Sequence, residues 1–146
     1  MLPFLDTDYE DEGDMSFDYV QATNGVTIHA QPIFMEDESD PEDHNYLWAY
    51  TIRIDNERSD VIELRTRHWR IIDSHGRCEE VTGDGVVGEQ PVIRPGESFE
   101  YTSCCPLKTA SGMMDGSYEF IVSGTRQRIP VPRFSLDSPY TGALIN

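Results

Sequence analysis

Apolar and polar residues alternate along much of this chain, and this period of two is the feature that most limits how it can fold. Over residues 26–34 most apolar side chains occupy every second position, and residues 48–55 repeat the pattern. The acidic segment 36–43 separates the two runs, which together predict a β-hairpin with a long loop. Because no segment shows the spacing of an amphipathic helix, we predict an all-β chain.

Further short strands are predicted at 61–73, 77–82, 98–105, 117–123 and 127–134. The apolar positions change parity between Leu64 and Trp69, which predicts a bulge or bend in that strand. Pro130 and Pro132 lie two apart, so the amide donors they lack would have faced one side, and we expect an unpaired sheet edge there. Seven or so short strands separated by turns predict an antiparallel β-sandwich.

The length of 146 residues suits one domain with tails. Residues 6–18 carry seven acidic residues and no basic one, so little apolar surface offsets the entropy of ordering them. We therefore expect an acidic disordered tail over 1–19, a β-sandwich domain over 20–140 and a short C-terminal tail over 141–146.

Charge and hydropathy exclude several functions. The net charge is −16, and residues 1–60 hold 16 acidic and 2 basic residues, so the chain should repel nucleic acid. No stretch approaches the roughly 18 apolar residues of a spanning helix, so we expect no membrane insertion and no ion conduction by this chain itself. The start lacks the pattern of a secretory signal, and three cysteines, two of them adjacent, make a poor disulfide framework. These features predict a cytoplasmic protein.

The sharpest local motif is Gly83-Asp84-Gly85-Val86-Val87-Gly88, which satisfies G-x-G-x-x-G. In a dinucleotide site this motif opens a helix that receives the pyrophosphate. Pro91 and Pro95 follow too closely for such a helix, and Asp84 adds negative charge. We favour a rigid loop that uses glycine for positive φ and close packing. A nest of backbone amides that binds phosphate is the alternative.

Other chemistry has weaker support. The 36–43 segment has six carboxylates without the spacing of an EF-hand, which favours a solvated loop over a cation site. A transition-metal site is conceivable from a subset of His68, His75, Cys78, Cys104 and Cys105. No C-x-x-C pair is present, and strand alternation sends Cys104 and Cys105 to opposite faces.

Candidates for catalysis are also weak. Asp73-Ser74-His75 contains the residue types of a catalytic triad, but consecutive residues cannot align as one. Lys108 is better explained as a solvated loop charge than as a catalytic amine. We predict no metal, no cofactor and no enzyme.

The central part of the chain contains a set of residues and short motifs that is too specific to arise by chance. It comprises Arg67-His68-Trp69, Gly76-Arg77, Glu80-Val81, Gly83 through Gly88, Gln90-Pro91, Pro95-Gly96, Phe99, Tyr101-Thr102-Ser103, Pro106-Leu107, Thr109 and Gly116. This block resembles the ApaG family, also called CorD. The chain departs from the family pattern at Cys104, where glycine is usual, and at Ala110, where proline is usual. The resemblance implies a fibronectin type III or immunoglobulin-like β-sandwich and an association with cobalt and magnesium resistance or efflux.

The leading hypothesis is a non-enzymatic interaction module that binds a protein partner, as a monomer or a homodimer, with an effect on divalent-cation handling. The candidate binding residues are Gly83, Asp84, Gly85, Val86, Val87, Gly88, Gln90, Pro91, Tyr101 and Ser103. A partner strand added to an open sheet edge is a second mode of the same function. Two other hypotheses are phosphate or pyrophosphate with Mg²⁺ at the 83–88 motif and cation sensing by the 36–43 segment.

Overall fold

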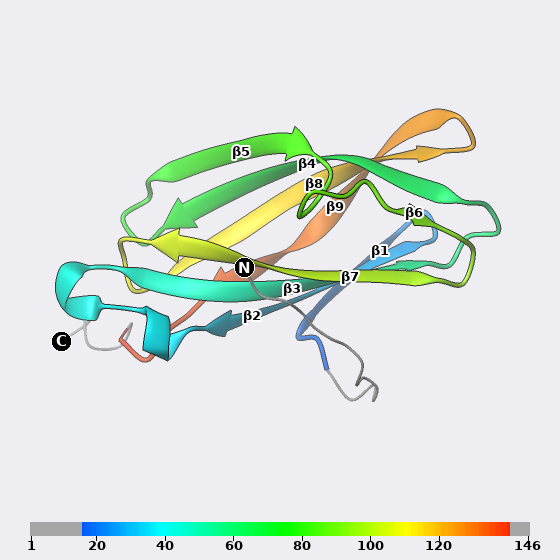
Figure 1. Ribbon diagram of the computed structural model, residues 1–146. Coiled ribbons are helices and arrows are strands. Elements are labelled where there is room, and N and C mark those ends of the chain that lie inside the picture. The colour runs from blue at the N-terminus through cyan, green and yellow to red at the C-terminus, as the bar shows by residue number, and fades with distance from the viewer. Residues whose placement is uncertain (1–15, 141–146) are drawn as a thin grey trace.

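The computed structural model describes residues 16–140, which form two antiparallel sheets packed face to face (Figure 1). One sheet has the strand order β1-β2-β3-β7, and the other has the order β5-β4-β8-β9 with β6 paired to β4. The strands are β1 (Tyr19–Thr23), β2 (Val26–Phe34), β3 (Tyr46–Asn56), β4 (Ile62–Asp73), β5 (Cys78–Asp84), β6 (Val92–Ile93), β7 (Ser98–Leu107), β8 (Gly112–Val122) and β9 (Thr125–Leu136). The predicted antiparallel β-sandwich is confirmed.

Each strand predicted from the alternation is present, and two further strands were not predicted. β1 shows little apolar alternation because its three central side chains are exposed, and β6 has only two residues. β1 begins at Tyr19, so the last residue assigned to the acidic tail lies in a sheet. Most of that tail and the predicted C-terminal tail, residues 1–15 and 141–146, lie outside the described residues.

The parity change in β4 marks a real irregularity in its pairing with β8. The register shifts between Leu64 and Thr66, which confirms the predicted bulge. Leu64 faces the core before the shift, and Trp69 faces it afterwards. Arg67, two residues before Trp69, is paired with the core residue Tyr118 and therefore lies on the same inner face. The bulge thus brings a cationic side chain to the interior side of the sheet.

The ends of the two sheets are formed by β1 and β7 in one and by β5 and β9 in the other. β9 carries Pro130 and Pro132, so the prediction that this strand is a sheet edge is confirmed. On the opposite side, the connection from β5 to β6 dips toward β7 (Figure 1). This connection, residues 85–91, is the part of the fold that carries most of the predicted binding residues.

Aromatic side chains from both sheets fill the centre of the core. The Trp69 ring lies 5.5 Å from Tyr50, 6.1 Å from Tyr118 and 6.1 Å from Phe134, measured between ring centroids. Such edge-to-face contacts add specific geometry to the burial of apolar surface. Trp48 is also buried, and its indole Nε1 donates a hydrogen bond of 2.8 Å to the Asp137 carbonyl.

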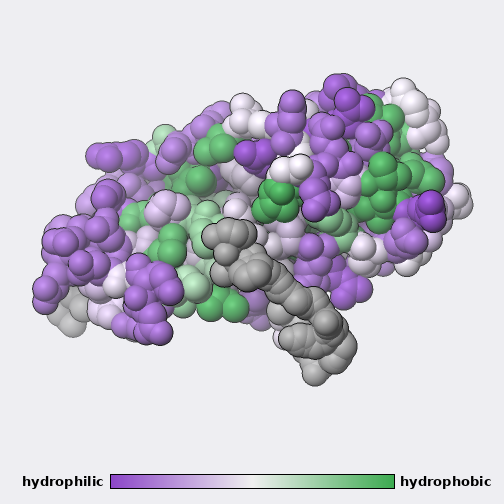
Figure 2. Space-filling view, in the orientation of Figure 1, coloured by the Kyte–Doolittle hydropathy of each residue, from purple (hydrophilic) through white to green (hydrophobic). Residues whose placement is uncertain are grey.

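The connection between β2 and β3 forms two short 3-10 helices, η1 (Glu36–Glu38) and η2 (Pro41–Asp43). Figure 2 shows hydrophilic surface over this end of the molecule. Within residues 16–140, no helix is both long and apolar enough to cross a membrane.

Candidate functional site

The glycine-rich motif forms a tight turn rather than the start of a helix. β5 ends at Asp84, and the backbones of Val86 and Glu89 exchange two hydrogen bonds of 2.8 Å. The two residues between them, Val87 and Gly88, have positive φ angles of 43° and 82°. Positive φ at both central positions is the signature of a type I′ turn. No helix begins at this loop within residues 16–140.

The bulged part of β4 anchors the loop. The Arg65 carbonyl accepts hydrogen bonds from the Gly85 amide (2.8 Å) and from the Gln90 side chain (2.9 Å). The Leu64 amide donates to the Pro91 carbonyl at 3.0 Å. These bonds hold both ends of the loop to one strand, so the turn between them is a rigid projection.

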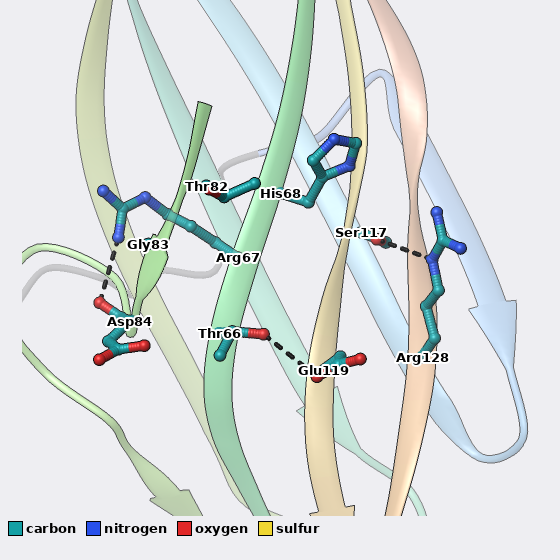
Figure 3. Close-up of a pocket in the computed structure, with 9 residues that line it drawn as sticks. All are labelled: Thr66, Arg67, His68, Thr82, Gly83, Asp84, Ser117, Glu119 and Arg128. Atoms are coloured by element: carbon teal, nitrogen blue, oxygen red, sulfur yellow. Dashed lines mark hydrogen bonds between the residues drawn. The ribbon is translucent and has the colours of Figure 1, made fainter. Parts of the chain in front are cut away.

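The Arg67 guanidinium closes the space beneath the loop. Its Nη1 donates to the carbonyl oxygens of Asp84 (3.1 Å) and Gly85 (2.9 Å), and Figure 3 shows the side chain reaching toward Asp84. A Cβ atom at Gly83 would lie 2.8 Å from this Nη1. Glycine at this position therefore leaves room for the arginine to cross β5.

A pocket of about 200 Å³ lies between the two sheets, beneath the turn, and we call it the inter-sheet pocket. Its lining residues are Tyr50, Arg67, Trp69, Val86, Val87, Gly88, Tyr101 and Ser103. β3 and β7 provide one wall, β4 provides another, and the turn forms the third. Val86 is buried at this wall, whereas the neighbouring Val87 side chain is 51% exposed.

The polar groups of the inter-sheet pocket are neutral except for Arg67. The hydroxyl of Tyr50 shares a side-chain hydrogen bond with Ser103, but burial raises the pKa of this phenol. Burial also raises the pKa of Tyr101, whose hydroxyl is paired with that of Tyr118. Trp69 is 3% exposed, and its Nε1 has no hydrogen-bond acceptor among the described residues. A buried donor without an acceptor is unusual in a folded protein.

A second hollow, the outer groove, is an open depression of about 430 Å³ on the solvent face of β5, β4, β8 and β9 (Figure 3). Two pairs of its side chains are hydrogen-bonded to each other, and Arg67 lines this groove as well as the inter-sheet pocket. Thr66 donates to Glu119 at 3.4 Å, and the Arg128 Nε donates to the Ser117 hydroxyl at 3.0 Å. Because these groups already have partners and the groove is open to water, the inter-sheet pocket is the better candidate site.

The structure brings together only part of the predicted binding set. Val86, Val87, Gly88, Tyr101 and Ser103 line the inter-sheet pocket. Gly83 and Asp84 line the outer groove instead. The remaining three, Gly85, Gln90 and Pro91, shape and anchor the loop. The site prediction omitted Tyr50, Arg67 and Trp69; the parity change in β4 was the available signal that Arg67 turns inward.

The loop offers few amides for a phosphate nest. The amides of Gly85, Val86 and Glu89 already donate to backbone carbonyl oxygens. A nest binds an anion through amides that point at it, so the phosphate hypothesis loses these three donors at this loop.

Hydrogen bonds join the acidic 36–43 segment to residues outside it. Glu36 accepts a hydrogen bond of 2.8 Å from the Tyr140 hydroxyl, and the Ser39 hydroxyl donates to the Met35 carbonyl. In the described part of the chain, no three histidine, cysteine or acidic side chains are grouped so that they could hold a metal ion.

Comparisons with known proteins agree with the family resemblance described from the sequence. A family model described as the ApaG domain matches residues 36–122. The Protein ApaG of Methylorubrum populi is 50% identical over 129 residues, which cover 88% of this chain and 99% of the relative. That of Rhodospirillum centenum is 49% identical over 123 residues, covering 84% and 95%. A crystal structure of a Bordetella pertussis protein solved under the name ApaA is 39% identical, with a TM-score of 0.77 and coverage of 86% and 100%.

Proposed function

The chain belongs to the ApaG family, and from that premise we propose that it is a non-enzymatic module that binds a protein partner. We place the contact on the side of the sandwich where the 85–91 loop meets β7. The observation that supports this choice most directly is the exposed Val87, held at positive φ on an anchored turn beside the inter-sheet pocket. A rigid loop on a sandwich scaffold is a common place for recognition.

The strand next to the loop supports the same placement. β7 pairs with β3 on one side and ends its sheet on the other. A sheet edge presents backbone donors and acceptors to which an extended segment of a partner can add. Tyr101 and Ser103 lie on this strand and also line the pocket, so an added segment would run beside the pocket mouth.

We further propose that any effect on cobalt or magnesium handling acts through the partner. The described residues group no set of metal-ligating side chains. The charge of −16 attracts cations only diffusely, and such attraction is screened by salt. A partner that itself handles the ion is therefore the more direct route for such an effect.

Site-specific photo-crosslinking tests the proposed surface. A photoreactive amino acid at Val87 is expected to give a defined adduct with a protein in host-cell extract. The matched control is the same amino acid at Ile33, which lies on β2, two strands away from β7 in the same sheet, and is 54% exposed. Equal labelling from both positions, or no adduct from position 87, would contradict the placement.

A further inference from the structure

We propose that the inter-sheet pocket receives a carboxylate group, bound by the Arg67 guanidinium and the Trp69 indole N–H. This inference rests on the proposed function, because we assign the carboxylate to an acidic side chain or chain end of the protein partner. It goes further by naming the chemical group that enters the pocket and the two residues that recognise it.

The first argument is the missing acceptor at Trp69. Its ring is packed among Tyr50, Tyr118 and Phe134, yet its Nε1 is without an acceptor in the described part of the chain. A buried donor left without a partner costs about 1–3 kcal/mol, which favours an occupant that brings an acceptor. Because the Nε1 atom is itself buried, the occupant reaches it only after a neighbouring pocket side chain shifts. Trp48 shows the usual arrangement in the same protein, since its Nε1 donates to the Asp137 carbonyl.

The second argument is the charge of the lining. Of the described residues that line the pocket, Arg67 alone is charged. Its Nη1 is used by two loop carbonyl oxygens, and a guanidinium carries further donors on Nε and Nη2. A planar guanidinium pairs with a planar carboxylate through charge-assisted hydrogen bonds. The hydroxyls of Tyr50 and Ser103 add groups that rotate to donate or accept.

The third argument is size. Sites for small molecules and cofactors commonly enclose about 300–1,000 Å³. The inter-sheet pocket encloses about 200 Å³, which suits one short side chain rather than a nucleotide. Tyr101 and Ser103 of β7, the edge strand to which a partner segment can add, line the pocket, so a side chain of that segment would lie close to it.

A singly charged carboxylate fits better than a phosphate. The pocket offers one cation, whereas phosphate carries up to two negative charges near neutral pH. The protein is strongly acidic, and Asp84 lies next to the loop. The additional charge of phosphate would thus meet repulsion that the single arginine does not offset.

The two tryptophans make the test direct. In a ¹⁵N-correlated NMR spectrum of the full chain, each indole N–H gives its own signal, and Trp69→Phe assigns the Trp69 signal by its loss. Sodium acetate is the probe, with sodium chloride at equal ionic strength, acetamide and inorganic phosphate as comparisons. We expect acetate to shift the Trp69 signal in a saturable way and to leave the Trp48 signal in place.

Arginine variants test the partner of the carboxylate. Arg67→Gln should weaken the acetate response about tenfold or more, because the charge-assisted pair is lost. Arg128→Gln, in the outer groove, should leave the response unchanged. The proposal is overturned if acetamide or chloride shifts the Trp69 signal as acetate does, if phosphate binds more tightly than acetate, or if Arg67→Gln responds like the unmodified chain.

The crosslinking experiment separates this inference from the proposed function. If position 87 captures a protein and acetate leaves the Trp69 signal unmoved, the partner surface stands and the carboxylate pocket fails. If acetate binds and position 87 captures nothing, the pocket stands and the assignment of its occupant to a protein partner fails. Capture that is lost in the Arg67→Gln variant, but not in Arg128→Gln, would support both.

Discussion

Tyr101 and Tyr118 join the two sheets through a hydrogen bond between their hydroxyl groups. Tyr101 lies on β7 and Tyr118 on β8, and the two side chains are 7% and 0% exposed. Strands of one sheet are held together by backbone bonds, but the two layers are held by side chains alone. This pair therefore fixes the layers next to the inter-sheet pocket by a directional contact.

The hydroxyl pair predicts a strongly non-additive mutant cycle. Tyr101→Phe or Tyr118→Phe alone should destabilise the protein by about 1–3 kcal/mol, because each leaves the other buried hydroxyl without its partner. The double variant should cost little more than one single variant, since both polar groups are then removed. Urea unfolding of the four proteins measures the coupling. Additive losses would contradict a direct hydroxyl contact.

Burial of several weak acids predicts a loss of stability at alkaline pH. Burial raises the pKa of Tyr101, Tyr118 and Tyr50, and it raises the pKa of Cys105 to about 12. The unfolded chain releases these protons at lower pH than the native chain, so the native state holds more protons there. Stability is thus fully present below about pH 9 and falls as pH rises, by up to about 1.4 kcal/mol per pH unit for each group.

Unfolding by urea at pH 8, 9, 10 and 11 measures this fall. Tyrosine ionisation followed by ultraviolet absorbance should show buried phenols that titrate only as the protein unfolds. The Tyr101→Phe/Tyr118→Phe variant should show a shallower fall above pH 10, because two of the responsible groups are gone. A stability that stays constant from pH 8 to 11 would contradict the assigned burial effects.

The loop glycines predict a contrast between two alanine substitutions. Gly85 has φ of +65°, and a Cβ atom there would collide with the Glu89 carbonyl oxygen. Gly88 has φ of +82°, but a Cβ atom there would meet nothing within 4 Å. Gly88→Ala should cost about 1 kcal/mol from backbone strain, and Gly85→Ala should cost more because the collision adds to that strain. Thermal unfolding compares the two, and equal losses would contradict the turn geometry.

The strand alternation predicted the fold because one face of most strands is buried. The apolar side chains at alternate positions of residues 26–34 and 48–55 are buried or half-buried against the core, so the period of two is visible in the sequence. The parity change in β4 also predicted its bulge. β1 was not predicted because its central side chains are exposed, so the strand has no apolar face to reveal it. β6 was not predicted because two residues are too few to show an alternation.

The site was predictable only on its loop side. Glycines and prolines in residues 83–91 indicate a rigid loop, and the predicted site joins that loop to Tyr101 and Ser103. Arg67 and Trp69 enter the pocket because β4 lies opposite β7 across the core, which is a property of the sheet order. Strand periodicity gives the face of a residue, but it does not give the neighbour across the core.

The three thiols predict two rates of modification. Cys78 and Cys104 are exposed, whereas Cys105 is 2% exposed and burial raises its pKa to about 12. Because the thiolate is the reactive form, a buried thiol with a raised pKa reacts slowly. A thiol reagent at pH 8 should therefore modify two cysteines quickly and the third at the rate at which the protein opens. This also tests the prediction that Cys104 and Cys105 face opposite sides of their strand.

Single substitutions identify which thiol gives which phase. Cys105→Ser should abolish the slow phase and leave both fast thiols, while Cys104→Ser should remove one fast thiol and keep the slow one. Added urea should speed the slow phase in proportion to the unfolded fraction, because opening exposes the Cys105 sulfur. Rapid modification of all three thiols in the native protein would contradict the position of Cys105 in the core beside Trp48, its partner residue on β3.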